Sequence, residues 1–436
     1  MTQEPKKVSR RKFIYIGIGA AILVVCGAAV YLSTRPPPLQ KVTWWIGSWS
    51  EDAAKQLKAQ FEKDNPGITI EINPLAWEGM HDKMVAAFQS GNAPDILDLL
   101  MSWTYEFAAA GWLLPLEDYN SQLQIDWNDF FPSALQTAKY KGKIYSVPFR
   151  GDCFAFVINT KLFKDSGLDP SNPPKTWDDV LVACEKIKST LPGEYYPTGF
   201  GLGQRDHAMT NFEYFCWSFG SEVLIEEAGK WKAAFNNDKG IKALDFMKTL
   251  YEKGYVPKGV LSLTGDDIWD MFVGGKIAMM PYKQYGLPLI QQKAPDMKVV
   301  VSQLPRQPDG LQFYNEYEGF SWVVNKNSKN LDATLKFLKF LSSPQNQAFY
   351  THTFPARKSA FQYGNLNFYK QDWNSPELKV YAEALNYGHP VYPISQKSDV
   401  AQILMEMIHA AFTGTKSSKQ AIEDAVNQIN KLLGAT

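Results

Sequence analysis

The sequence predicts an α/β protein of two lobes, each a mostly parallel sheet flanked by helices, with one transmembrane helix in front of them. Three observations support this prediction. The chain has 436 residues, more than one hydrophobic core usually serves, so two lobes are expected. Strand-like and helix-like segments alternate from Lys41 onward, which is typical of parallel sheets. A long apolar segment precedes them at 13–33.

The residues before Lys41 predict export and a membrane anchor. Residues 1–12 are basic, and we expect them to stay in the cytoplasm. The segment 13–33 is long enough to span a bilayer as a helix. Residues 34–40 contain consecutive prolines, which form a stiff spacer. We therefore expect an uncleaved anchor that holds the folded protein at the outer face of the cytoplasmic membrane.

Three other fates of the N-terminal segment stay open. Residues 9–14 (SRRKFI) resemble a twin-arginine export signal. Cys26 could be acylated, although Val25 before it is larger than the small residue that a lipobox requires. A signal peptidase could cut near residues 27–29.

The composition argues for an uncharged small ligand. The 45 basic and 45 acidic residues cancel and form no basic stripe, so nucleic acid is not an expected partner. Aromatic residues make up 14 % of the chain, more than a core of this size needs. Some of these rings are therefore expected to face a ligand.

Cysteine and histidine give no sign of a metal or another cofactor. Outside the apolar segment lie Cys153, Cys184 and Cys216, an odd number that permits one disulfide at most. Cys153–Cys216 is the candidate pair, and three buried thiols are the favoured alternative. The five histidines show no ligand-like spacing, so we expect no zinc site and no cofactor.

The first half of the mature chain has the order β-α-β-α-β. Strands are predicted at 41–46, 67–72 and 95–100. Ser50 can cap the first helix, and a second helix presents Met80 and nearby apolar residues on one face. Ligands of such sheets bind at the carboxyl ends of the strands.

The pattern of strands and helices resumes after Lys143. Strands are predicted at 144–149, 154–159, 276–280, 298–302 and 320–325. Helices begin near Thr176, Lys239 and Asn330, and the last one spans 418–433. No repeat of fixed period occurs, which excludes a solenoid.

Eight motifs follow one another in a fixed order. They are FEKDNPGITIEI (61–72), GNAPDILDL (91–99), GWLLPLEDY (111–119), YKGKIYSVPF (140–149), FVINTKLFKDSGLDPSNPPKTWDD (156–179), MFVGGKIAMM (271–280), GFSWVVNKNSKN (319–330) and FPARKSAF (354–361). With this order the chain from about 41 to 433 resembles the family 1 extracellular solute-binding proteins of ABC importers, of the sugar-binding type. The resemblance implies a two-lobed periplasmic-binding-protein-like fold (type II).

The same resemblance implies how the chain is divided. The first lobe would contain 41–150 and 303–343, and the second lobe 151–302 and 344–436. The corner from Pro148 to Gly151 agrees with a hinge there, because proline fixes one dihedral angle and glycine frees others.

A sugar has an apolar face and a rim of hydroxyls, so its site needs aromatic rings and planar polar side chains. In the first lobe, Trp45, Trp49, Trp77 and Trp103 stand in loops at one end of the predicted strands. Any of these tryptophans could instead belong to the core.

The other candidate ligand-binding residues combine polar groups near the crossovers with groups of the second lobe. They are Asp98, Arg150, Asp152, Asn211, Trp217, Tyr282, Tyr285, Glu318 and Arg357. Structural roles stay open for three sites. Arg150 and Asp152 could form a hinge ion pair, Asp98 could satisfy a backbone donor, and Arg357 could hold the second lobe against the third crossing.

The function that the resemblance implies is capture of a sugar or oligosaccharide by closure of the lobes, and its delivery to a membrane permease by a monomeric binding protein. A non-sugar solute such as glycerol phosphate or a polyamine is the alternative. A secreted polysaccharide-acting enzyme is a further one, because Asp152, Glu316 and Glu318 could supply two carboxylates. No nucleophile elbow or phosphate loop supports catalysis.

Overall fold

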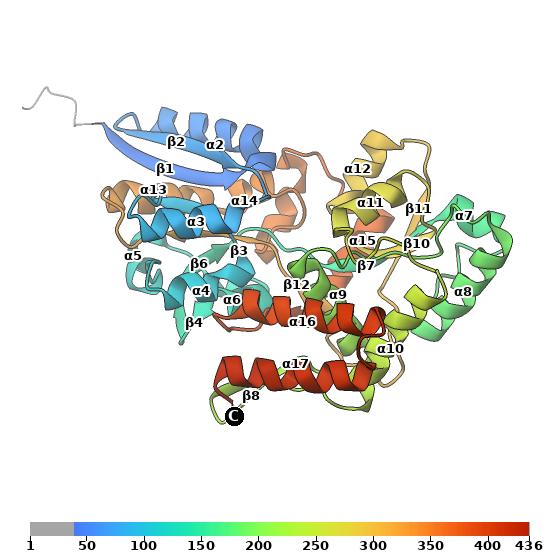
Figure 1. The fold of residues 1–436 in the computed structure, drawn as a ribbon. Coiled ribbons are helices and arrows are strands. Elements are labelled where there is room, and N and C mark those ends of the chain that lie inside the picture. Colours follow the sequence, from blue (N-terminus) through green and yellow to red (C-terminus); the bar gives the residue numbers. More distant parts are fainter. Residues whose placement is uncertain (1–38, 436) are drawn as a thin grey trace, which may run out of the picture.

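Two separate sheets organise the chain, each inside its own lobe, and several segments cross between the lobes (Figure 1). The structure is a computed structural model and describes residues 39–435. The predicted membrane segment 13–33 lies outside these residues. Within the described part, no helix combines the length and the apolar character that crossing a membrane requires.

The first lobe is built on a five-stranded sheet with the strand order β2-β1-β3-β13-β6. The strands are β1 (Gln40–Gly47), β2 (Ile68–Leu75), β3 (Ile96–Leu100), β6 (Ser146–Pro148) and β13 (Phe320–Val324). Strand β1 pairs with β2 and β3 in parallel, as predicted for a β-α-β-α-β segment. Strand β13 runs antiparallel to β3 and β6. The prediction of a mostly parallel sheet is confirmed for this lobe.

Seven helices belong to the first lobe in the described residues. They are α2 (Glu51–Asp64), α3 (Met80–Gln89), α4 (Thr104–Ala109), α5 (Asn120–Leu123), α6 (Pro132–Thr137), α13 (Leu331–Leu341) and α14 (Pro344–Tyr350). Helix α2 buries Ala53, Leu57 and Phe61, because the apolar residues of its sequence recur at helical spacing. A short hairpin of β4 (Lys139–Tyr140) and β5 (Lys143–Ile144) precedes β6.

The sheet of the second lobe differs from the prediction. It has three strands in the order β10-β7-β11, and β7 is antiparallel to both neighbours. The strands are β7 (Phe154–Asn159), β10 (Met279–Lys283) and β11 (Val299–Ser302). The expectation of a mostly parallel sheet is wrong here. The central strand β7 leads away from the crossing segments, whereas β10 and β11 lead back toward them.

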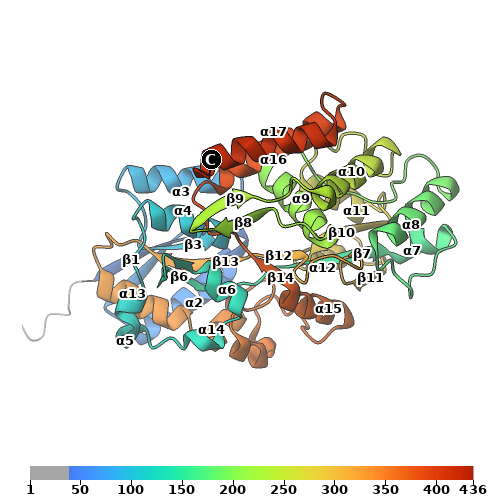
Figure 2. The same ribbon diagram turned by 90° about the horizontal axis from the view of Figure 1, so that it is seen from below.

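Helices make up most of the second lobe. They are α7 (Thr160–Asp165), α8 (Trp177–Thr190), α9 (Arg205–Phe219), α10 (Asp238–Glu252), α11 (Gly265–Val273), α12 (Gly286–Lys293), α15 (Pro376–Ala384), α16 (Lys397–Phe412) and α17 (Ser418–Leu433). Helix α16 packs on α9, and α17 packs on α16 and on the hairpin of β8 (Leu224–Glu227) and β9 (Lys230–Ala233) (Figure 2). Helix α9 is therefore surrounded by other elements along most of its length.

Three segments cross between the lobes side by side, and backbone hydrogen bonds join them. The N–H of Asp152 donates to the carbonyl of Glu318 at 2.7 Å, and the N–H of Glu318 donates back to Asp152 at 3.1 Å. The N–H of Gly151 donates to the carbonyl of Phe354 at 2.8 Å. The crossing near Glu318 follows the short strand β12 (Asn315–Tyr317), which pairs with β14 (Gly388–Pro390).

The lobe boundaries differ from the expected ones in two places. Helix α14 packs against α2 and α13, so the chain stays with the first lobe beyond residue 343. The phenol of Tyr350 also donates to Asp98 in that lobe, at 2.6 Å. Conversely, the N–H of Leu311 donates to the carbonyl of Trp217 at 2.8 Å. Residues 303–314 therefore lie with the second lobe, because the loop that contains them packs on α9.

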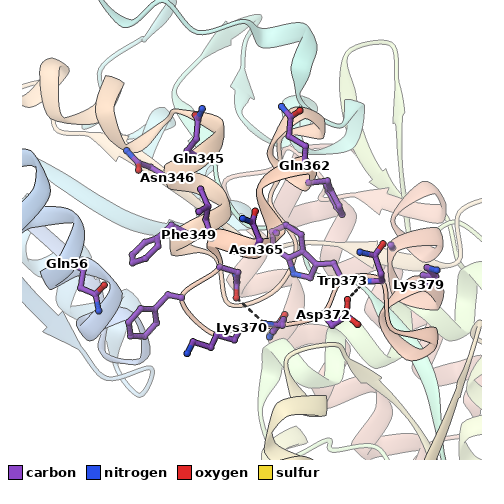
Figure 3. A pocket seen from close by; sticks show the side chains of 18 of the residues that line it. Gln56, Gln345, Asn346, Phe349, Gln362, Asn365, Lys370, Asp372, Trp373 and Lys379 are labelled. Carbon is purple, nitrogen blue, oxygen red and sulfur yellow. Dashed lines mark hydrogen bonds between the residues drawn. The ribbon is translucent and has the colours of Figure 1, made fainter.

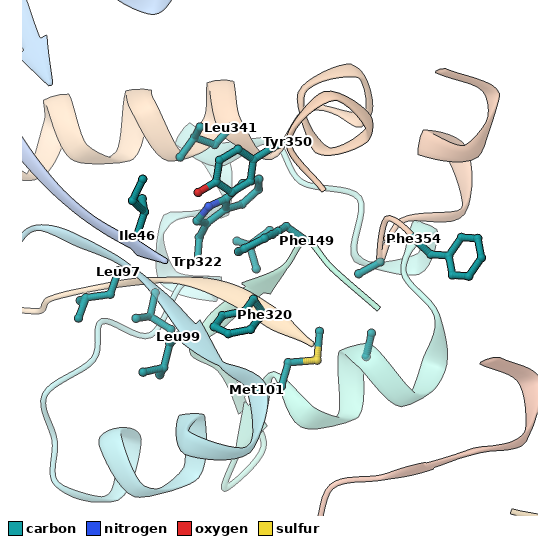
Figure 4. Close-up of a cluster of buried hydrophobic side chains, with 14 of the residues drawn as sticks. Ile46, Leu97, Leu99, Met101, Phe149, Phe320, Trp322, Leu341, Tyr350 and Phe354 are labelled. Atoms are coloured by element: carbon teal, nitrogen blue, oxygen red, sulfur yellow. The ribbon is translucent and has the colours of Figure 1, made fainter. Parts of the chain in front are cut away.

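Aromatic side chains fix the strands that lead into the crossings (Figure 4). Phe149 stacks on Trp322 with 4.4 Å between ring centroids, and Tyr350 lies 5.2 Å from Phe149. All three side chains are buried. Such contacts make the base of the crossing segments rigid on the side of the first lobe.

The three cysteines of the described residues are free and buried. The Cys153–Cys216 disulfide is therefore not formed, and the favoured alternative of three buried thiols is what the structure shows. Burial raises the pKa of each of these thiols. Raised pKa values make the thiols poor nucleophiles, so we assign them to packing.

Candidate functional site

A large open groove of about 1670 Å³ runs between α2 and α14 of the first lobe and α15 of the second (Figure 3). Its walls are rich in amides, among them Gln56, Gln345 and Asn365. Some of the lining amides already bond to the backbone, as Asn346 does to the carbonyl of Phe340 at 2.7 Å. A small ligand in such an open groove would keep much of its surface in water, which argues against tight capture.

A smaller cavity of about 380 Å³ lies between the lobes and is the better candidate for a ligand site. Trp49, Trp77 and Leu100 line it from the first lobe, and Arg150, Asp152, Glu318, Phe320 and His352 line it from the crossing segments. The second lobe supplies Phe154, Phe200, Gly201, Asp206, His207, Thr210, Asn211, Gly265, Asp266, Met280, Pro281, Tyr282, Lys283, Tyr285 and Leu289. A molecule held there touches both lobes and the crossings at once.

Aromatic faces supply much of the apolar lining. Trp49 and Trp77 lie 6.4 Å apart with their planes tilted by 58°. Trp77 is backed by Trp103, which stacks on it at 5.7 Å. Tyr282 stacks on the buried Trp269 at 4.0 Å. The rings that line the cavity are thus held in place by rings behind them, which lowers the entropy cost of binding a flat ligand.

Arg150 and Asp152 form a buried ion pair beside the cavity. The Nη2 of Arg150 lies 2.7 Å from Oδ2 of Asp152, and its Nε donates to Oδ1 at 3.0 Å. Asp152 also accepts from the hydroxyl of Thr353 at 2.7 Å. The guanidinium lies over the rings of Tyr285 and Phe320. The ion pair with Asp152 uses two N–H groups of Arg150, and the other guanidinium N–H groups remain for a ligand.

A second group of charges includes two residues of the cavity lining, Lys283 and Glu318, and two residues behind them, Glu316 and Lys397. The Nζ of Lys283 lies 3.5 Å from Glu318, and the Nζ of Lys397 donates to Glu316 at 3.2 Å. Burial opposes charge on Glu318, but Lys397 and Lys283 outweigh it and hold its pKa below the ordinary value. Burial, and then the charge of Glu316, raise the pKa of Glu213 well above its ordinary value. The raised pKa favours the uncharged form of Glu213, and the two lysines balance the charges of Glu316 and Glu318.

The N-termini of α9 and α11 meet at the cavity and bring Asp206, His207 and Asp266 together. The N–H of Gly265 donates to Nδ1 of His207 at 2.9 Å, so the ring carries its proton on Nε2. Burial lowers the pKa of His207, which keeps the ring neutral. The phenol of Tyr282 donates to Oδ1 of Asp266 at 3.1 Å. These groups offer one donor and two carboxylate acceptors.

The structure places most of the residues suggested by the sequence at this cavity. The ones that line it are Trp49, Trp77, Arg150, Asp152, Asn211, Tyr282, Tyr285 and Glu318. Arg150 and Asp152 also form the ion pair that was expected as the alternative, and this pair lies where the chain crosses between the lobes. Asn211 uses its amide nitrogen on the carbonyls of Gly201 and His207, so its donors are already occupied.

Three of the tryptophans suggested by the sequence do not line the cavity. Trp45 is half-buried on the face of β1 opposite to the buried Trp44, and Lys83 lies over its ring. Trp103 stands behind Trp77. Trp217 is buried in the second lobe, where its Nε1 donates to Tyr392 at 3.1 Å. These corrections follow from the side of the element on which each ring falls.

Asp98 and Arg357 have structural roles instead of a place at the cavity. Asp98 accepts from the indole of Trp44 at 2.9 Å inside the first lobe. Arg357 donates from Nε to Asp129 at 2.7 Å and from Nη1 to the carbonyl of Ser342 at 2.6 Å. Both bonds of Arg357 fix the third crossing segment to the first lobe, whereas the alternative predicted that it would hold the second lobe against this crossing.

The sequence prediction missed Asp206, His207, Asp266 and His352. A signal for the first three was present in the glycines of GFGLG (199–203), which precede α9. A Cβ on Gly201 would lie 2.3 Å from the backbone carbon of Thr264. Only glycine lets this loop approach the start of α11 so closely. The spacing indicated close backbone contact, but not which residues it would bring together.

Two lobes that are joined by crossing segments, with an aromatic and polar cavity between them, are typical of proteins that bind a small molecule between their lobes. The family described as bacterial extracellular solute-binding protein matches residues 47–348. The chain belongs to this family, as its ordered motifs suggested, and is an extracellular solute-binding protein of an ABC importer.

Known relatives cover nearly the whole described chain. A binding protein of Brucella abortus strain 2308 is 26 % identical over 384 residues, which are 87 % of this chain and 89 % of that one. The sn-glycerol-3-phosphate-binding periplasmic protein UgpB of Escherichia coli K12 is 26 % identical over 409 residues, with 86 % and 88 % covered. An ABC transporter solute-binding protein from Thermotoga lettingae TMO, solved with α-D-tagatose, is similar with a TM-score of 0.78 and 26 % identity, over 90 % of this chain and 100 % of that one.

Proposed function

We propose that the chain captures a sugar of one or two rings in the interlobe cavity and delivers it to the membrane permease of its importer. The observation that carries the proposal is the lining of the cavity. Rings from the first lobe and hydrogen-bonding groups from the second line the same cavity. Its volume of about 380 Å³ is at the small end for ligand pockets, which favours a short sugar over a long oligosaccharide.

The two halves of a sugar fit the two kinds of lining. Trp49 and Trp77 can cover an apolar ring face, because both line the cavity and Trp103 supports Trp77 from behind. Carboxylates such as Asp206 and the spare donors of Arg150 can bond the hydroxyl rim. Contacts on both lobes are complete when the lobes are closed, so a bound sugar stabilises the closed state.

A polysaccharide-acting enzyme is disfavoured by the state of its candidate carboxylates. Asp152 is held by two contacts from Arg150, and Glu316 and Glu318 each lie beside a lysine. Glycosidic cleavage needs one carboxyl group that carries a proton and can give it to the leaving oxygen. Each of the three carboxylates is instead engaged by a basic side chain, so we propose binding without chemistry.

The N-terminal segment completes the proposal. We infer that residues 13–33 anchor the protein at the outer face of the cytoplasmic membrane, with the basic residues 1–12 inside and the spacer 34–40 outside. This rests on charge and hydropathy alone. Anchoring would keep a monomeric binding protein close to its permease. Membrane fractionation of the native protein, followed by mass spectrometry of its N-terminus, distinguishes an intact anchor from cleavage or acylation.

Calorimetry tests the sugar assignment. The purified protein is titrated with mono- and disaccharides, with sn-glycerol 3-phosphate and with spermidine, and any small molecule that co-purifies is identified by mass spectrometry. We expect binding of at least one sugar. Tight binding of glycerol phosphate or spermidine, without binding of any sugar, would contradict the sugar assignment. Release of a shortened sugar product would show that the protein is an enzyme.

A further inference from the structure

The acidic groups of the cavity are not matched by its basic groups. Arg150 is paired with Asp152 by two contacts. Lys283 and Lys397 are balanced by Glu316 and Glu318, which lie within 3.5 Å of one lysine each. Glu213 is buried and does not line the cavity. These pairs leave the cavity neutral apart from two further carboxylates.

The two remaining carboxylates belong to Asp206 and Asp266. Neither forms an ion pair with any of the residues that the structure describes. Both stand in the first turn of a helix, where the helix dipole stabilises their charge without using up their oxygens. Asp266 accepts one phenol bond from Tyr282 and keeps its other oxygen free. Each side chain can therefore accept hydrogen bonds from a ligand.

His207 lies between these carboxylates in sequence and in space, and it does not offset their charge. Its Nδ1 accepts the backbone N–H of Gly265, so adding a proton there would break that bond. The ring therefore gives the ligand one N–H donor and no charge. Arg150, which is 7 % exposed, lines the same cavity and supplies donors whose charge Asp152 has already compensated.

We propose that Asp206, His207 and Asp266 determine the charge of the ligand: they accept uncharged or cationic hydroxylated molecules and exclude anions such as phosphate esters and carboxylates. This inference rests on the proposed function, since it concerns the same cavity. It separates this protein from its sn-glycerol-3-phosphate-binding relative by chemistry. A phosphate would lie near two carboxylates that form no ion pair with the described residues, and such repulsion costs at least about tenfold in affinity.

Matched sugars of different charge test the inference. The protein is titrated with glucose, glucosamine and glucose 6-phosphate, and with the same trios built on galactose and mannose, at low and high salt. Where a neutral sugar binds, its phosphate should bind at least about tenfold more weakly. This gap in affinity between the neutral and the phosphorylated sugar should narrow in high salt, because salt screens the repulsion. A phosphate that binds as tightly as its neutral partner, in any trio, overturns the inference and leaves sugar binding intact.

A double variant assigns the effect to the two carboxylates. Asp206→Asn with Asp266→Asn should narrow the gap between neutral and phosphorylated sugar at least about threefold. The control is Asp245→Asn with Asp332→Asn, which removes the same charge from exposed positions on α10 and α13. An unchanged gap in the first variant, or an equal change in the control, shows that the carboxylates do not set the charge preference.

Quenching of tryptophan fluorescence decides the matter if no sugar binds, in which case the sugar assignment fails by itself. Trp49 and Trp77 share the cavity with both carboxylates, whose negative charge attracts caesium and repels iodide. The ratio of caesium quenching to iodide quenching should therefore be higher in the wild type than in a protein without these two charges. Replacing Asp206 and Asp266 by Asn should shift this ratio toward iodide, and the control variant should not. A ratio that does not move overturns the inference without any ligand.

Discussion

Gly319 is the residue at which the smallest change should disturb the hinge most. Its φ is +145°, and an added Cβ would lie 2.0 Å from the backbone oxygen of Arg150. Real Cβ atoms stay at least 3.0 Å from such neighbours, so Gly319→Ala would push the crossing segments apart by about 1 Å. The neighbouring backbone bonds between Asp152 and Glu318 would then weaken.

The magnitude follows from the two effects together. An alanine at such a φ costs about 1–3 kcal/mol. Losing the two backbone bonds of the crossing adds about 1 kcal/mol each. We therefore expect Gly319→Ala to destabilise the protein by about 3–5 kcal/mol. Gly275→Ala is the matched control, because Gly275 also has a positive φ of +71° but no atom within 4 Å of the added Cβ. It should cost only about 1 kcal/mol.

Thermal and urea unfolding of both variants measure the difference, and calorimetry with the tightest-binding sugar measures the effect on the site. Gly319→Ala should lower stability at least threefold more than Gly275→Ala and should weaken binding, because Arg150 and Glu318 would move. Gly275→Ala should leave binding unchanged. Equal losses of stability in the two variants would refute the account of the hinge.

Three further predictions concern single side chains. Trp77→Ala should weaken sugar binding about tenfold in calorimetry, whereas Trp112→Ala, at a half-buried ring away from the cavity, should not; equal effects would contradict the assigned roles. Burial raises the pKa of Asp98 from 3.8 to about 7, so the folded protein keeps a proton that the unfolded chain loses. Stability should therefore fall by up to about 4 kcal/mol between pH 4 and 7 relative to Asp98→Asn in urea unfolding, and parallel pH profiles would disprove this. Nitrogen-15 NMR of the imidazoles should show His207 with its proton on Nε2 and with a pKa below that of an unfolded histidine; a proton on Nδ1 would contradict the structure.

Much of the fold could be predicted because local patterns determine it. The apolar stripe of α2 and the alternation of β1 follow from residues that are neighbours along one element. The direction of β10 and β11 could not be predicted in this way, because periodicity is the same for parallel and antiparallel strands. The lobe to which α14 belongs could not be predicted either, because it depends on contacts with α2 and α13, which are tertiary contacts and leave no local pattern in the sequence.

The site was only partly predictable. Trp77 and Trp217 look alike in the sequence, but α9 is enclosed by other elements and turns Trp217 into the core. Asp206 and Asp266 meet only because two loops touch through Gly201, and no local signal connects residues so far apart. Aromatic content thus predicts a ligand with flat apolar faces, whereas the arrangement of the acceptors required the three-dimensional structure.

The unpaired thiols bear on how this protein can be produced. Folding of residues 39–435 requires no oxidant, since Cys153, Cys184 and Cys216 are free thiols in the folded protein. The mature body can therefore complete its folding in a reducing cytosol as well as in an oxidising exterior. Routes that carry already folded cargo and routes that thread an unfolded chain are equally compatible with this chemistry, and recombinant material needs no disulfide isomerase.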